Sequence, residues 1–114
     1  MKTEHQEQVD FVNWFRIAFP SILVFAVPNG GFRHPATARK LKAEGVVKGI
    51  PDMYVPEWNL WIEMKRLKGG SVSAEQKSMI LYLTKYCGHQ AIVGKGFDDA
   101  KSQVEAFAVL KQKW

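Results

Sequence analysis

The feature that most constrains how this chain folds is a short apolar strand pattern with an acid inside it. Leu60–Lys65 is largely apolar but carries Glu63 in its interior and Lys65 at its end. A second β-rich run, Met53–Val55, precedes it, and only Pro56–Asn59 separates the two. Two such runs with a four-residue connection predict an antiparallel hairpin. Because an unpaired buried carboxylate is costly, the acid must find a partner or a metal ion.

This hairpin register brings a second acid close to the first. With residues 56–59 as the loop, Val55 pairs with Leu60, and Asp52 falls opposite Glu63. Directly opposed side chains have Cβ atoms about 4.5–5.5 Å apart. Lys65 projects from the same face as Glu63, because side chains alternate along a strand. The spacing therefore predicts two carboxylates and one ammonium group at one point.

Such a cluster is typical of a site that holds a divalent cation. Two carboxylates this close repel each other unless a cation lies between them or a pKa is raised. Oxygen ligands suit a hard ion, Mg²⁺ or Mn²⁺, and the backbone carbonyl near Met64 is a further candidate ligand. Water held by such a metal is a better nucleophile. Lys65 is a candidate either to position that water or to stabilise the phosphorane-like charge. The cluster therefore predicts metal-dependent hydrolysis of a phosphodiester.

Basic residues lie on both sides of this acidic pair, in a chain whose formal net charge is +5. Between Arg33 and Lys48 the only acid is Glu44, and a second basic cluster follows the strand pattern. The candidate contacts to a phosphate backbone are Arg33, Arg39, Lys42, Lys48, Arg66 and Lys68. Basic clusters that flank an acidic pair indicate a nucleic acid approaching a metal site.

The remaining elements predict an α/β fold. In the first half of the chain we expect a helix over Thr3–Phe19 with a Thr3–Gln6 capping box, a buried strand at Ile22–Val27, and a short basic helix or loop over His34–Glu44. In the second half we expect a helix from Ser73 to about Tyr86, a strand at Gln90–Gly94, and a helix from Asp98 or Asp99. The apolar face of the helix from Ser73 consists of Met79, Ile80, Leu83 and Tyr86. This order predicts a small mixed sheet flanked by helices. With 114 residues, we expect a single domain over residues 1–114.

Several other classes of protein are not indicated. No run of about 18 apolar residues is present, and the polar N-terminus lacks an apolar signal core, so we expect a cytoplasmic protein with no membrane contact. Cys87 is the only cysteine, which excludes an intramolecular disulfide. The three histidines show no zinc-ligand spacing, and no phosphate-binding loop or serine-hydrolase motif occurs.

Three segments together resemble a known family. They are Gly49-Ile50-Pro51-Asp52, Trp61-Ile62-Glu63-Met64-Lys65 and Gly69-Gly70-Ser71-Val72-Ser73-Ala74-Glu75-Gln76. In this combination the chain resembles the VRR-NUC branch of the PD-(D/E)XK nucleases, from Glu4 to about Phe107. The resemblance implies a restriction-endonuclease-like α/β core and Mg²⁺-dependent cleavage of DNA, often flapped or branched. It is similar to stand-alone members of phage or prophage type, which would act in the host cytoplasm.

The resemblance also implies roles for individual residues. Asp52 and Glu63 match the metal-binding carboxylates, and Lys65 matches the catalytic lysine. Gln76 matches a helix glutamine beside the site. Ser73 and Gln76 also form a capping box, so two roles compete for one side chain.

Two further matches leave alternatives open. Glu4 matches an acid on the first helix that binds the metal, with Glu7 as the alternative. Asn29 matches an asparagine near the nucleic acid, with a plain Pro-Asn-Gly turn as the alternative.

Three functions follow from these observations. The first is a structure-specific DNA endonuclease of phage replication, repair or recombination. The second is a Holliday-junction resolvase of the same family that acts as a homodimer. Its candidate interface residues are Trp58, Phe97 and Trp114, for which a place in the core is an equal alternative. The third is a non-catalytic nucleic-acid-binding module. The set of Asp52, Glu63 and Lys65 argues against this third function, because carboxylates beside phosphate without a metal would weaken binding.

Overall fold

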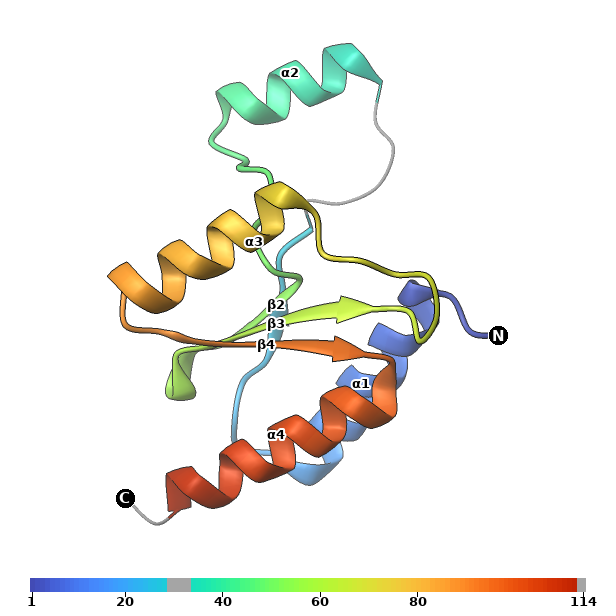
Figure 1. Cartoon of the computed structure of the whole chain (residues 1–114), viewed down its shortest axis with the longest axis vertical. Coiled ribbons are helices and arrows are strands. Elements are labelled where there is room, and N and C mark those ends of the chain that lie inside the picture. Colours follow the sequence, from blue (N-terminus) through green and yellow to red (C-terminus); the bar gives the residue numbers. More distant parts are fainter. Residues whose placement is uncertain (29–33, 113–114) are drawn as a thin grey trace.

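A computed structural model of the chain describes residues 1–28 and 34–112. Its elements are α1 (Glu4–Ala18), β1 (Phe25–Ala26), α2 (Pro35–Ala43), β2 (Met53–Val55), β3 (Leu60–Lys65), α3 (Ala74–Leu81), β4 (Gln90–Lys95) and α4 (Phe97–Gln112). The sheet order is β1-β2-β3-β4, with β1, β2 and β3 antiparallel and β4 parallel to β3. Helices α1 and α4 lie on one side of the sheet and α3 on the other, with α2 beyond α3 (Figure 1). The predicted mixed sheet flanked by helices is confirmed.

The β2–β3 hairpin has the predicted register. Val55 pairs with Leu60, and the ladder continues to Met53 opposite Ile62. A 3₁₀ turn over Pro56–Trp58 makes the connection, and Asn59 closes it in the left-handed region at φ 48°. Asparagine tolerates that conformation better than most residues, so the loop and hence the register follow from local sequence.

The core lies between the sheet and the pair α1–α4. Its buried apolar side chains are Phe11, Phe15, Val24, Met53, Val55, Trp58, Leu60, Ile62, Met64, Ala100, Val104 and Ala108. Helix α4 approaches β4 closely, since a Cβ added to Gly94 would lie 2.5 Å from the Cβ of Ala100. Trp58 belongs to this core at 8% exposure, and its ring contacts Phe15 and Phe19. Of the two roles open to Trp58, interface residue or core residue, the structure supports the core role, because the hairpin turn folds its ring inward.

The first strand is much shorter than predicted. Only Phe25 and Ala26 pair with β2, and both are exposed, whereas a buried strand was expected over residues 22–27. Within residues 1–28 and 34–112 its only strand partner is the three-residue β2, and no further strand lies along its outer edge. Val24 alone in this segment is buried in the core.

The two remaining helices differ from expectation in detail. Tyr86, predicted on the apolar face after α3, is 73% exposed, whereas Leu83 is buried. The helix changes to a π-helical turn over Tyr82–Tyr86, which rotates later side chains away from the 3.6-residue period. The basic segment forms helix α2, whose N-cap is His34. None of the described helices is long and apolar enough to cross a membrane.

Candidate metal centre

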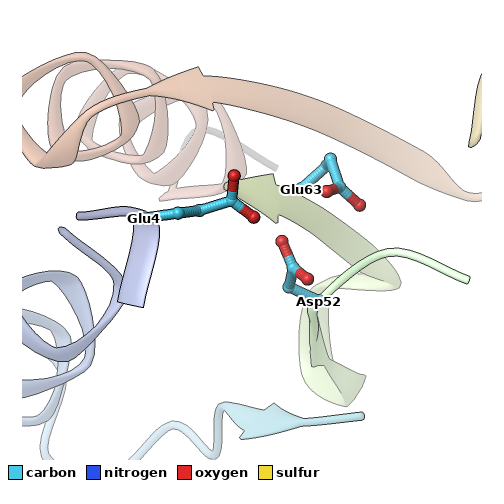
Figure 2. Close-up of side chains that lie close together, drawn as sticks. All are labelled: Glu4, Asp52 and Glu63. Carbon is cyan, nitrogen blue, oxygen red and sulfur yellow. The ribbon is translucent and has the colours of Figure 1, made fainter. Parts of the chain in front are cut away.

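Three carboxylates from distant parts of the sequence meet at one end of the β2–β3 hairpin. Glu4 comes from the first turn of α1, Asp52 precedes β2, and Glu63 lies in β3. One oxygen of each lies within 4.8 Å of the others. Figure 2 shows the three groups pointing toward a common space. The predicted meeting of Asp52 and Glu63 is thus present, with Glu4 as a third acid.

Glu63 is the most deeply buried member of this cluster, with 1% of the residue exposed. Its Oε2 lies 3.4 Å from Lys65 Nζ and accepts a hydrogen bond of 3.1 Å from Gln76 Nε2. Its Oε1 is buried and has no hydrogen-bond partner among the described residues. Burial and then the negative charge of Asp52 raise the pKa of Glu63 to about 8, and Lys65 opposes the shift only in part. A buried, unpartnered oxygen beside two more carboxylates fits a hard divalent cation.

Asp52 is oriented by the backbone of the opposite strand. Its Oδ2 accepts a hydrogen bond of 2.7 Å from the Met64 N–H. Pro51 is fully buried, and Gly49 has a φ of 86°. A Cβ at Gly49 would lie 2.6 Å from the carbonyl oxygen of Glu75, so only glycine lets this segment pack against the start of α3. The glycine before Pro-Asp thus holds the Asp52 segment beside the helix that carries Gln76.

Gln76 performs both of the roles that were expected to compete. Its Oε1 accepts from the Ser73 N–H at 2.9 Å, while the Ser73 hydroxyl accepts from the Gln76 N–H at 3.1 Å. Its Nε2 donates to Glu63. The predicted competition is wrong, because a side-chain amide has an acceptor end and a donor end. The capping box fixes the amide so that its donor end faces the acid.

The structure distinguishes Glu4 from Glu7. Glu7 is 8% exposed, and its Oε1 accepts a hydrogen bond of 3.0 Å from the N–H of Phe97, the first residue of α4. Its carboxylate therefore caps α4, while half-buried Glu4 joins the acidic cluster. This cap also explains why α4 begins at Phe97 rather than at Asp98 or Asp99. Sequence analysis missed the capping role, because the two partners lie ninety residues apart.

Lys65 approaches the cluster from the end of β3. Its side chain is 9% exposed, and the neighbouring Gly96 N–H donates to the Lys65 carbonyl at 2.7 Å. Gly96 also lies against Glu7, since a Cβ there would be 3.2 Å from Glu7 Oε2. The end of β3, the start of α4 and the first turn of α1 are therefore joined directly beside the acids.

The predicted nucleic-acid contacts lie outside this cluster. Arg39, Lys42, Lys48, Arg66 and Lys68 are all exposed. Arg39 and Lys42 belong to α2, which stands apart from the sheet (Figure 1). His34 accepts a hydrogen bond from the Ala36 N–H through Nδ1 and so caps α2. Asn29, Arg33 and Trp114 fall outside the described residues, so their predicted roles remain predictions.

The chain is similar to a solved structure of known domain type. No family model matches the chain, and no curated protein matches it. A solved structure described as a VRR_NUC domain protein superposes with a TM-score of 0.74 and 25% sequence identity. The match covers 93% of this chain and 88% of that one. The chain has a VRR_NUC-like fold. This likeness supports a nuclease domain, in agreement with the resemblance based on Gly49–Asp52 and Trp61–Lys65.

Proposed function

We propose that this protein is a Mg²⁺- or Mn²⁺-dependent endonuclease that hydrolyses phosphodiester bonds in DNA. The observation that carries this proposal is the buried Glu63, whose Oε1 has no hydrogen-bond partner among the described residues and which shares one space with Glu4 and Asp52. Three acids gathered at such a point stabilise a folded protein poorly unless a cation neutralises them. The likeness to a VRR_NUC domain protein supports the same class of activity.

The residues around the acids would divide the work of such a site. Glu4, Asp52 and Glu63 would hold the ion, with the backbone carbonyl of Met64 as a further ligand. A bound divalent ion supplies electrophilic activation of the phosphate and lowers the pKa of a water molecule. Gln76 keeps Glu63 in place through its hydrogen bond, and the Lys65 ammonium group lies where it would stabilise negative charge on a phosphate.

The proposed substrate is DNA with a flap, branch or junction, as met in phage replication, repair and recombination, in the host cytoplasm. The net charge of +5 and the exposed basic side chains on both sides of the acids support a polyanionic partner. In this proposal Arg39, Lys42, Lys48, Arg66 and Lys68, together with Arg33 and Asn29, contact the DNA backbone. The alternative of a dimeric resolvase loses part of its support, because Trp58 lies in the core.

The test is cleavage of labelled single-stranded, duplex, flap and four-way-junction DNA with Mg²⁺, Mn²⁺ or a chelator. We expect metal-dependent cleavage that Asp52→Ala abolishes. The matched control is Glu57→Gln, which changes an exposed acid in the hairpin turn and should leave cleavage intact. Equal cleavage by Asp52→Ala, or binding without any cleavage, would contradict the proposal, and the latter would favour a non-catalytic module. Light scattering on the same samples tests the dimer.

A further inference from the structure

Two successive rows of side chains cross the outer face of the sheet, and only one of them belongs to the acidic cluster. Phe25 pairs with Tyr54, and Tyr54 pairs with Trp61, so three aromatic residues occupy one row across β1, β2 and β3. The next row on the same face contains Glu63, two residues beyond Trp61 in β3, and Asp52, which immediately precedes β2. The aromatic row therefore adjoins the proposed catalytic carboxylates.

The rings of this row are in contact and are held in fixed orientations. The centroids of Tyr54 and Trp61 lie 4.3 Å apart at an interplanar angle of 35°, and Phe25 meets Tyr54 edge-on at 5.9 Å. Trp61 Nε1 donates to His89 Nδ1 at 2.9 Å, and the Tyr54 hydroxyl donates to Asn59 Oδ1. Rings that are oriented in advance lose little entropy when a flat ligand binds.

The three aromatic residues of this row are not part of the buried core. The core lies on the opposite face, under α1 and α4, whereas α3 lies on the side of the row and reaches Glu63 through Gln76. On the outer face Tyr54 and Trp61 are only half-buried, and Phe25 is 43% exposed on a strand of two residues. Cross-strand aromatic pairs do stabilise sheets, but an exposed aromatic row beside a charged site also offers a binding surface.

We infer that Phe25, Tyr54 and Trp61 form a platform on which an unpaired base stacks, next to the phosphate that is cleaved. The inference rests on the proposed nuclease function and specifies its substrate. Two residues along a strand span roughly 6.5 Å, about the length of two stacked nucleotides at roughly 3.4 Å each. A base within two nucleotides of the phosphate at the carboxylates therefore reaches the row. Base faces are open to aromatic rings only where the strand is unpaired.

Charge favours a nucleic acid over a second copy of this chain as the occupant of the row. The chain carries a net charge of +5, which opposes self-association and attracts a polyanion. Stacking on aromatic rings is also largely independent of base identity. The platform therefore selects for an unpaired strand beside the cleavage site, as in a flap or a branch, rather than for a base sequence or continuous duplex.

A double-mutant cycle between protein and DNA tests the platform. Binding of the intact protein to a forked DNA is measured by fluorescence anisotropy with Ca²⁺ in place of Mg²⁺, so that affinity is read without cleavage. The first three unpaired nucleotides of the fork are either thymidines or abasic sites. The variants are Tyr54→Leu and Phe25→Leu, which keep an apolar side chain but remove the ring face. The control is Tyr86→Leu, an exposed aromatic residue in the turn after α3.

We expect Tyr54→Leu to weaken binding of the thymidine fork by about ten-fold, with a smaller loss for Phe25→Leu and none for Tyr86→Leu. On the abasic fork, both variants should bind within about two-fold of the unaltered protein. Equal losses on both forks, or no loss on either, would overturn the platform. A dimer that Phe25→Leu dissociates in light scattering would also overturn it, since a second copy would then cover the row.

The two proposals fail in different ways. Metal-dependent cleavage without coupling between ring and base would support the nuclease function and contradict the stacking platform. Coupling without cleavage in Mg²⁺ would leave a single-strand-binding surface and remove the nuclease. If Tyr54→Leu loses its folded circular dichroism spectrum, Phe25→Leu still gives the answer, because its ring is exposed at the sheet edge.

Discussion

The two faces of the β2–β3 hairpin are made from the same short segments but do different work. The inner face presents Met53, Val55, Ile62 and Met64, all fully buried against α1 and α4. The outer face presents Asp52, Tyr54, Trp61, Glu63 and Lys65. Because side chains alternate along a strand, adjacent residues such as Ile62 and Glu63 belong to different faces. Substitutions one position apart should therefore separate folding from catalysis.

The two faces also differ in the effect that burial of their side chains has on stability. On the inner face, removal of apolar surface from water stabilises the fold. At the outer end of the hairpin, burial raises the pKa of Glu63 and leaves one of its oxygens without a hydrogen bond among the described residues. In the proposed function, such a site would lower the stability of the metal-free protein and favour the binding of a cation. The buried apolar side chains of the inner face therefore stabilise the hairpin and hold the acids of the outer face in place.

The largest effect is expected from Glu63→Gln on the outer face. The amide keeps the shape but removes a negative charge from the three acids, so metal-dependent cleavage should fall by at least about 100-fold. The folded state should be no less stable at pH 8, because a buried charge disappears. Initial rates and thermal melts of the same preparation measure both. Cleavage within about two-fold of the unaltered protein would show that this acid does not serve the reaction.

The adjacent substitution Ile62→Ala should show the opposite pattern. It leaves a cavity in the core and should lower the free energy of unfolding by about 2–5 kcal/mol. Cleavage per folded molecule, at a temperature well below the melting midpoint, should stay close to that of the unaltered protein. Urea denaturation gives the first quantity and initial rates give the second. A loss of rate without a loss of stability would break the division between the faces.

Glu7 connects the start of α4 with the first turn of α1, which also carries Glu4. Glu7→Ala should therefore lower both the stability of the fold and the metal affinity of the site, each moderately. Without its carboxylate the Phe97 N–H loses its acceptor, and stability should fall by about 1 kcal/mol. Because Glu4 lies on the same helical turn, the Mg²⁺ concentration for half-maximal cleavage should rise roughly ten-fold, with little change in the saturated rate. Glu7→Gln, which still offers an acceptor oxygen, should recover much of this loss, whereas Glu105→Gln on the exposed side of α4 should change neither. An unchanged metal requirement in Glu7→Ala would separate the cap from the site.

The last prediction concerns the pH dependence of stability in the metal-free protein. The pKa of Glu63 in the folded, metal-free protein is about 8, above its ordinary value of 4.5. The folded state therefore binds a proton more tightly than the unfolded chain, so stability decreases as pH rises from about 5 to 8. The melting temperature in a chelator should fall by several degrees over this range, and Glu63→Gln should flatten the trend. Added Mg²⁺ should raise the midpoint more at pH 8 than at pH 5, because binding releases the proton. A metal effect that is larger at pH 5 would contradict this assignment.

Much of this site could be predicted from local sequence. The four-residue turn specifies the register between Val55 and Leu60, and the two-residue period of a strand then places Glu63 and Lys65 on one face. The glycine at position 49 and the serine at 73 marked the segments that meet there, although the reason for Gly49 is its contact with the Glu75 backbone. The register and the common face of Glu63 and Lys65 depend on residues close to one another in the sequence, which is why the pattern indicates them.

The rest required the tertiary structure. The choice of Glu4 over Glu7 and the start of α4 at Phe97 depend on contacts between elements far apart in the chain. The dual role of Gln76 depends on how α3 packs against β3. The two-residue β1 also followed from the length of its partner rather than from its own apolar run. By itself the sequence determined a hairpin with two acids and a lysine on one face, because turn geometry and strand alternation are local. Only the packing of α1, α3 and α4 around that hairpin decided which further side chains reach the acids, because the orientation of a helix relative to a sheet depends on the whole core.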